Sequence, residues 1–496
     1  MKNKFLKIIV ICFCSLVIFN GCKKYLDTTP KNSLDLTFAL STREGLQATL
    51  VAIYDALQAS GYYGRDFVVI PELLADNSEI TSNNTNRFIN QANNSPNNHV
   101  NIWAIAYRNI NRANLILGSI DGSQASASEK VLWKGEAYFL RALLYADLIK
   151  AYSRNPLYLS TSPAGSFDLG VPIMKTAVID AAAITFPARN KVTEVYDFIM
   201  QDLVLANSLL TNAGNGYRAR RVAAQALASR VELYRGNWAQ SERWADSVLL
   251  GNAVPLAPAS TYFNLSVTPP SWGNAHPETI FGINYLVGEN GPGTDGIQYI
   301  NYRNIPSIQG YADVTTQTSL RNDMGTTGVA GITSADQRFT KLISIQIKSG
   351  QQVFYTMKWP GFKGNGVAGL DDIMILRTSE IVLNRAEARA RQGGAKEALA
   401  IADLNQTRTR AGLTAFPTTG IGAPAGAALI AEILKERRVE LAFEGHRLWD
   451  ILRTGADITK SPANIVLGSN AYNFLYANIL QADLDVNPNL VKNPGY

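Results

Sequence analysis

Cysteine and histidine are scarce in this sequence, with three of each among 496 residues. Cys12 and Cys14 lie in an N-terminal segment that we expect to be removed, and Cys22 is expected to carry lipid. No cysteine follows Cys22, so the mature chain has no disulfide and cannot be a small disulfide-stapled scaffold. The histidines are far apart in sequence and do not have the spacing of zinc ligands. We therefore expect no thiol catalysis, no zinc or thiolate metal site and no cofactor, whereas a calcium ion bound by the oxygen-rich loops stays open.

Charge is also sparse. Charged residues make up 17% of the chain, against about 25% in typical globular proteins. Lys and Arg number 46 and Asp and Glu 40; without Lys2, Lys4 and Lys7, in the segment expected to be removed, the balance is 43 minus 40, or +3. Without a long basic block, this surplus gives no basis for nucleic-acid binding. Apolar residues, at 46%, can supply a large core.

Long apolar runs are confined to the N-terminus. Ile8 to Phe19 follows three lysines and is twelve residues long, which is too short for the roughly 20 residues of a membrane span. It predicts a secretory signal peptide over residues 1–21, and Asn20-Gly21-Cys22 resembles the end of a lipobox. We expect Cys22 to be lipidated and residues 22–496 to form a soluble body held to the membrane by that lipid. An ordinary signal peptide with an incidental cysteine is the alternative.

Helical periodicity dominates much of the remaining chain. Val222 to Leu250, broken at Gly236-Asn237, and Arg377 to Arg410, broken at Gly393-Gly394, each predict two antiparallel helices of roughly tetratricopeptide length. The predicted fold is mainly α, with tetratricopeptide-like stacked helical pairs and a large irregular, loop-rich part. Four more segments repeat apolar residues at three- and four-residue steps and predict helices with one buried face: Ala48 to Leu57, Trp103 to Leu117, Glu129 to Tyr152 and Val192 to Leu210.

Two long irregular regions interrupt these helices, around residues 76–102 and 255–370. Asn77 to Asn101 holds ten asparagines in 25 positions, and Pro255 to Gly310 is broken by Pro and Gly and carries several aromatic residues. Long loops within a compact domain are usually functional. We therefore expect the ligand to bind there.

The C-terminal segment carries a family resemblance. Glu436 to Arg453 contains ERRVELAFEGHRLWD and resembles the signature helix of the SusD/RagB family of surface lipoproteins. Further stretches agree with that family and extend the resemblance over the mature chain, which we expect to be a single SusD-like domain: Cys22–Pro30, Leu376–Ala390, Asn405–Gly412 and Asn493–Tyr496. We expect the signature helix to be structural, with four charged residues three or four positions apart able to pair: Arg437, Glu440, Glu444 and Arg447.

The resemblance implies a non-catalytic, glycan-binding lipoprotein of the outer membrane. Such a protein captures oligo- or polysaccharide at the cell exterior and delivers it to a TonB-dependent, SusC-like transporter. A peptide ligand, as for RagB-like members, is the alternative within the family. Lys23 and Lys24 follow Cys22 where surface lipoproteins of this kind often carry acidic residues, so a periplasmic orientation stays open.

Sugar recognition combines flat aromatic rings with paired hydrogen bonds from Asn, Asp, Gln and Arg. For each residue of these loops, a turn-forming or small-core role is the competing interpretation. Candidates for hydrogen bonding are Asp76, Asn77, Arg87, Asn93 and Asn94, and candidates for stacking are Trp272, Tyr299, Tyr302 and Tyr311.

A lipid-anchored glycoside hydrolase is the enzymatic alternative. Asp371-Asp372 is an adjacent acidic pair, but neighbouring side chains diverge, and we expect these residues to begin the next helix. Two G-x-G-x-x-G patterns, starting at Gly291 and Gly364, lack the strand-turn-helix context of a dinucleotide site.

Overall fold

The computed structural model describes residues 36–82, 84–96, 98–159, 167–265, 272–286, 288, 291–301, 310–326, 334–348, 350–361, 363, 369–460 and 464–496. The predicted lipidation site Cys22 and the predicted site residue Tyr302 lie outside these ranges. Within them the chain is mainly helical, which confirms the predicted fold class. None of the described helices is both long and apolar enough to cross a membrane.

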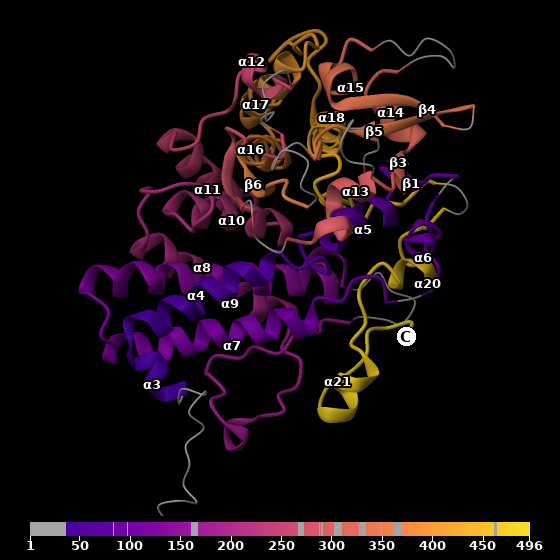
Figure 1. Cartoon of the computed structure of the whole chain (residues 1–496). Helices are drawn as coiled ribbons and strands as arrows, with labels where there is room; N and C mark the ends of the chain where they lie inside the picture. The colour runs from indigo at the N-terminus through magenta and orange to yellow at the C-terminus, as the bar shows by residue number, and fades with distance from the viewer. Residues whose placement is uncertain are drawn as a thin grey trace, which may run out of the picture.

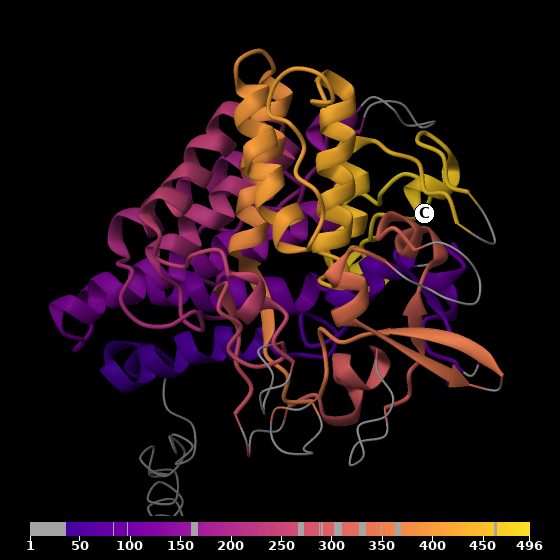
Figure 2. The same cartoon turned by 90° about the horizontal axis from the view of Figure 1, so that it is seen from above.

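A layer of mostly long helices, which begins with the short α3, forms one side of the molecule (Figures 1 and 2). Helices of this layer that follow one another in the chain pack side by side. Helix α11 also packs directly on α16, although an irregular region separates them in sequence. The helices of the layer are α3 (Leu36–Ser41), α4 (Arg43–Leu57), α7 (Trp103–Ser119), α8 (Ala127–Tyr152), α9 (Val192–Leu209), α10 (Arg221–Tyr234), α11 (Trp238–Gly251), α16 (Thr378–Gln392), α17 (Lys396–Arg410) and α18 (Gly426–Glu440).

The two predicted helical pairs are α10–α11 and α16–α17. Gly236 ends the first helix of one pair with φ +76°, and Gly393 and Gly394 separate the other pair with φ +69° and +60°. Glycine adopts this left-handed conformation without the steric cost of a Cβ. Ser229 and Ser241 exchange hydrogen bonds to each other's carbonyl oxygens, at 3.1 and 2.9 Å, so these small side chains allow α10 and α11 to pack closely.

Short elements and loops make up the other side of the molecule. Three antiparallel two-stranded sheets pair β1 (Ser78–Ile80) with β3 (Val314–Thr316), β2 (Thr279–Ile283) with β6 (Ile373–Arg377), and β4 (Ile343–Lys348) with β5 (Gln351–Thr356). Asp371 and Asp372 precede strand β6, so the expectation that they begin a helix is wrong. The short helices are α5 (Asp66–Leu74), α6 (Ile89–Ala92), α12 (Ala259–Tyr262), α13 (Ile297–Asn301), α14 (Thr318–Asp323), α15 (Gln337–Leu342), α19 (Arg447–Thr454), α20 (Asn470–Asn473) and α21 (Gln481–Val486), with 3₁₀ turns η1 (Ile120–Gly122), η2 (Pro156–Tyr158), η3 (Ala181–Ala183) and η4 (Gly293–Asp295).

The predicted signature helix is two helices. Helix α18 ends at Glu440, α19 begins at Arg447, and the turn between them places Phe443 at φ +68° and Gly445 at φ +79°. A β-carbon on Gly445 would lie 2.8 Å from the carbonyl oxygen of Phe67, so this glycine allows the turn to approach α5.

The four charged residues of the signature segment do not pair with one another as expected, and each pairs with another residue instead. Arg437 bonds Asp450, and Arg447 bonds Asp76. Glu440 and Glu444 belong to a buried ion-pair network of four cations and five carboxylates, which come from the chain between Glu278, just before β2, and the turn after α18: Arg338, Lys358, Arg377, Arg410, Glu278, Asp336, Glu436, Glu440 and Glu444. Arginine pairs therefore tie this segment into the fold.

Candidate functional site

Asp76 and Asn77 are buried and bound to protein, which corrects their prediction as ligand contacts. The carboxylate of Asp76 accepts from Arg447 Nε at 2.6 Å and Nη2 at 2.9 Å, and it also pairs with Arg438. Burial opposes its charge, but the two arginines outweigh that effect and hold the pKa of Asp76 below its usual value. Asn77 donates to Glu72 at 2.7 Å and accepts from Arg438 at 2.9 Å. Both side chains are fully engaged in joining α5 to α18 and α19.

Glu72 completes this junction. Its carboxylate accepts hydrogen bonds from the backbone N–H groups of Phe443, Gly445 and His446, at 3.0, 2.9 and 3.1 Å. Burial raises the pKa of Glu72 despite these bonds. The loop that follows α5 therefore starts from a support fixed to the C-terminal segment.

Asn93 and Asn94 follow helix α6. Asn93 is exposed, and its backbone N–H ends the helix by donating to Ile89 O. Asn94 has φ +49°, and its side-chain amide donates to Leu74 O at 2.8 Å. Asn94 thus shapes the turn, as the competing interpretation held, while the side chain of Asn93 is accessible.

Trp272 is fully buried, which corrects its prediction as a stacking platform. Its indole N–H donates to Tyr262 O at 3.0 Å, and its ring centroid lies 4.5 Å from that of His276. The ammonium group of Lys358 lies 4.9 Å from the ring. Protein atoms cover the indole, so Trp272 belongs to a small core under the loops.

Arg87 from the segment before α6, Tyr299 from α13 and Tyr311 from the segment before β3 lie together. The guanidinium of Arg87 stacks over the ring of Tyr311 at 4.2 Å, and the rings of Tyr299 and Tyr311 lie 5.7 Å apart. Two backbone bonds fix the tyrosines, because Tyr311 N–H at 2.7 Å and Ala312 N–H at 3.0 Å both donate to Tyr299 O. All three side chains are half-exposed. We call Arg87, Tyr299 and Tyr311 the aromatic–arginine cluster.

Four residues that the sequence analysis did not single out surround this cluster. Arg65 lies 5.6 Å above the ring of Phe88, and Asp295 pairs with Arg65 at 3.1 Å and Arg87 at 3.6 Å. The buried Asp313 accepts from the backbone N–H and hydroxyl of Thr85 at 2.7 and 2.8 Å and lies 3.7 Å from Arg87. For Arg65, burial opposes the charge, but Asp66 and Asp295 outweigh it and raise its pKa.

The surface around the cluster combines aromatic rings with fixed arginine donors and acidic acceptors, the groups that bind pyranose rings and their hydroxyls. Phe88 follows Arg87 directly and has φ +60°, so a single strained turn presents both side chains. Figure 1 shows α6, α13 and the β1–β3 pair, the elements nearest in sequence to these residues, on the loop-rich side of the molecule.

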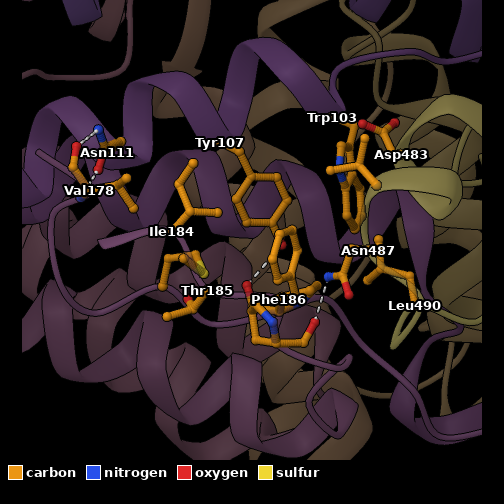
Figure 3. Close-up of a pocket in the computed structure, with 14 residues that line it drawn as sticks. Trp103, Tyr107, Asn111, Val178, Ile184, Thr185, Phe186, Asp483, Asn487 and Leu490 are labelled. Carbon is orange, nitrogen blue, oxygen red and sulfur yellow. Dashed lines mark hydrogen bonds between the residues drawn. The ribbon is translucent and has the colours of Figure 1, made fainter. Parts of the chain in front are cut away.

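A separate cavity of about 430 Å³ lies between α7, the loop of residues 172–187 and α21 with the segment after it (Figure 3). Its walls are mostly apolar, with Trp103, Tyr107 and Phe186 presenting rings and Asp483 at one end. None of the predicted site residues that the structure describes lines it.

The acidic pair of the enzymatic alternative is buried. Burial raises the pKa of Asp371 to about 7, and its carboxylate accepts from Gly361 N–H at 2.7 Å. Asp372 accepts from Tyr217 at 2.6 Å and pairs with Lys363. Both carboxylates thus hold loops together in the interior. In the described part of the chain, no group of three or more Asp, Glu, His or Cys is arranged to hold a metal ion.

Comparison with known proteins identifies relatives along most of the chain. A family model described as "SusD family" matches residues 351–496, and one described as "Starch-binding associating with outer membrane" matches residues 24–233. SusD-like protein P38 of Formosa agariphila is 25% identical over 491 residues, covering 91% of this chain and 92% of that protein.

Two solved structures show the same fold. A putative sugar binding protein from Bacteroides vulgatus has a TM-score of 0.76 and 26% identity, covering 92% of this chain and 99% of that one. A SusD superfamily protein from Bacteroides thetaiotaomicron has a TM-score of 0.75 and 25% identity, covering 91% of this chain and all of that one. The two family models, the relative aligned along nearly its whole length and the shared fold agree that this chain belongs to the SusD family of carbohydrate-binding, outer-membrane-associated proteins.

Proposed function

We propose that this protein is a non-catalytic glycan-binding lipoprotein that captures oligo- or polysaccharide and delivers it to a SusC-like, TonB-dependent transporter. Residues 1–21 act as the signal peptide, and lipid on Cys22 holds a single domain, residues 22–496, to the outer membrane, facing the cell exterior.

The aromatic–arginine cluster carries this proposal. Arg87, Tyr299 and Tyr311 are half-exposed and held in place by stacking and backbone bonds, so little conformational entropy is lost when a ligand binds. The tyrosine faces would stack on sugar rings, and Arg87 would donate to hydroxyl groups. Asp295, with a side chain 54% exposed, would accept from them. Binding of this kind requires no reactive group.

A binding experiment tests the proposal. The mature domain is titrated with a panel of polysaccharides and oligosaccharides by isothermal calorimetry, and products are sought by chromatography. We expect saturable binding without product, and Tyr311→Ala should weaken it about two- to tenfold, because a lost stacking contact of about 0.5–1.4 kcal/mol corresponds to that range. The matched control is Trp238→Ala, which removes a similar ring under Arg391, at 4.7 Å, on the helical layer.

Three results would contradict the proposal. Binding that is unchanged in Tyr311→Ala and lost in Trp238→Ala would move the site away from the cluster. Binding only to proteolysed protein would favour the peptide-binding alternative, and released oligosaccharide would favour the hydrolase.

The orientation is tested on intact cells. External protease should remove the protein from the cell surface if it faces outward, whereas protection until the outer membrane is permeabilised would indicate the periplasmic orientation suggested by Lys23 and Lys24.

A further inference from the structure

The cavity beside α7 is held open by the protein's own hydrogen bonds. The side-chain amide of Asn111 donates to Val178 O at 3.0 Å and accepts from Val178 N–H at 2.7 Å. Tyr107 donates to Pro172 O at 2.8 Å, and Asn487 donates to Pro187 O at 2.9 Å, which ties α21 to the same loop. The walls are therefore preformed, and these polar side chains are already occupied by backbone groups (Figure 3).

Apolar side chains continue from the cavity onto the surface. Ile184, Phe186 and Val486 line the cavity and are 51%, 46% and 67% exposed. Ile179 and Val491, next in sequence to lining residues, are 58% and 51% exposed. Contiguous exposed apolar surface of this kind marks a binding face on proteins that stay in solution. We call the cavity with Ile184, Phe186 and Val486 the α7–α21 groove.

One charge at the groove lacks a counterion. Asp483 lines the cavity, and burial raises its pKa. The carboxylates of Asp483 and its neighbour Asp485 enter no ion pair with any residue that the structure describes. An occupant with a basic group beside an apolar one would complement both the walls and this charge.

We propose that the α7–α21 groove docks a polypeptide segment of the transporter that presents a large apolar side chain next to a lysine or arginine. The inference rests on the proposed delivery function and adds the surface that carries it. A sugar fits the groove poorly, because Asn111 and Asn487 already bind backbone and few free partners remain for hydroxyl groups. Figure 1 shows α7 and α21 well apart from α13 and the β1–β3 pair, so docking here leaves the aromatic–arginine cluster open to ligand.

Photo-crosslinking in cells tests the docking. The full-length, tagged protein is produced with p-benzoylphenylalanine in place of Ile184 or Val486 and is purified with its bound transporter. We expect crosslinks to the transporter from both positions. Val204 on α9 and Ile347 on β4, which are 51% and 77% exposed, serve as control positions with similar apolar exposure and should give none.

Matched variants separate this inference from the proposed function. The double variant Phe186→Asp with Val486→Asp should lower the recovery of transporter at least tenfold and leave glycan affinity unchanged, whereas Val204→Asp with Ile347→Asp should alter neither. Asp483→Lys should also lower recovery, because it repels the basic residue of the docked segment.

Contrary results have distinct meanings. Wild-type recovery in the groove variant, or crosslinks from Ile184 and Val486 only to a second copy of this chain, would overturn the groove as the docking surface while delivery stands. Loss of glycan binding in the groove variant would show a ligand site there instead. If the wild-type protein recovers no transporter, the delivery function falls together with this inference.

Discussion

Replacing Arg377 by methionine perturbs the centre of the buried ion-pair network. Arg377 is 1% exposed, and its guanidinium lies 2.6 Å from Glu444, 2.9 Å from Glu440 and 3.1 Å from Glu278. Methionine fills much of the same length without the charge. The substitution therefore leaves three buried carboxylates with one cation fewer.

The expected loss of stability follows from this charge balance. The network holds four cations and five carboxylates, a net charge of 4 minus 5, or −1, and Arg377→Met makes it −2. Removing one partner of a buried pair costs about 3–5 kcal/mol, because the remaining charge is left without compensation. A typical domain has only about 5–15 kcal/mol of stability, so the change is a large fraction of the total.

Urea unfolding followed by far-UV circular dichroism and tryptophan fluorescence measures the effect. The control is Arg43→Met, because Arg43 pairs with Glu129 at 2.6 Å but its side chain is 44% exposed, and water screens such a pair so that it contributes little to stability. Equal midpoints for the two variants would refute the view that this network stabilises the fold by compensating buried charge.

Three further predictions follow from particular residues. Gly445→Ala should lower stability by about 2–4 kcal/mol in the same assay, because φ is +79° and the new Cβ would lie 2.8 Å from Phe67 O; a wild-type midpoint would contradict this. The pKa of Asp371 is about 7 in the folded protein, so as the pH rises from about 4 this carboxyl group ionises first in the unfolded state. Between about pH 4 and 7 the wild type should therefore lose on the order of 4 kcal/mol of stability relative to Asp371→Asn. Parallel stability–pH profiles for the two proteins would disprove this prediction. Cys22→Ser should release the protein from the membrane fraction on cell fractionation, whereas retention would argue against a lipid anchor.

The helical part of the fold was predictable because its signals are local. Apolar periodicity placed α8 and α9 within two residues of their observed ends, and glycines marked the turns of the two predicted pairs. The signature segment was wrongly predicted as one helix, because its spacing of charged residues is helical. Phe443 adopts φ +68° in a turn that Glu72, about 370 residues earlier, stabilises.

The candidate site was predictable in residue type and only partly in position. Sequence indicated the loops that hold Arg87, Tyr299 and Tyr311, but it could not distinguish them from Trp272, which lies in a similar loop. Burial of Trp272 depends on Lys358 and other distant residues that cover it. Phe88 was detectable as the neighbour of Arg87, whereas Arg65 precedes an apolar helix and carried no sign of a ligand site.

The junction between Glu72 and the turn after α18 has a consequence for how the protein is made. The 76–102 loop begins at a support whose partners, Phe443 to Arg447, are synthesised about 370 residues after Glu72. A nascent chain that has already exposed Arg87 still lacks the segment that anchors the base of that loop. A chain truncated before Phe443 should therefore leave the base of the 76–102 loop unsupported and bind glycan more weakly than the full chain.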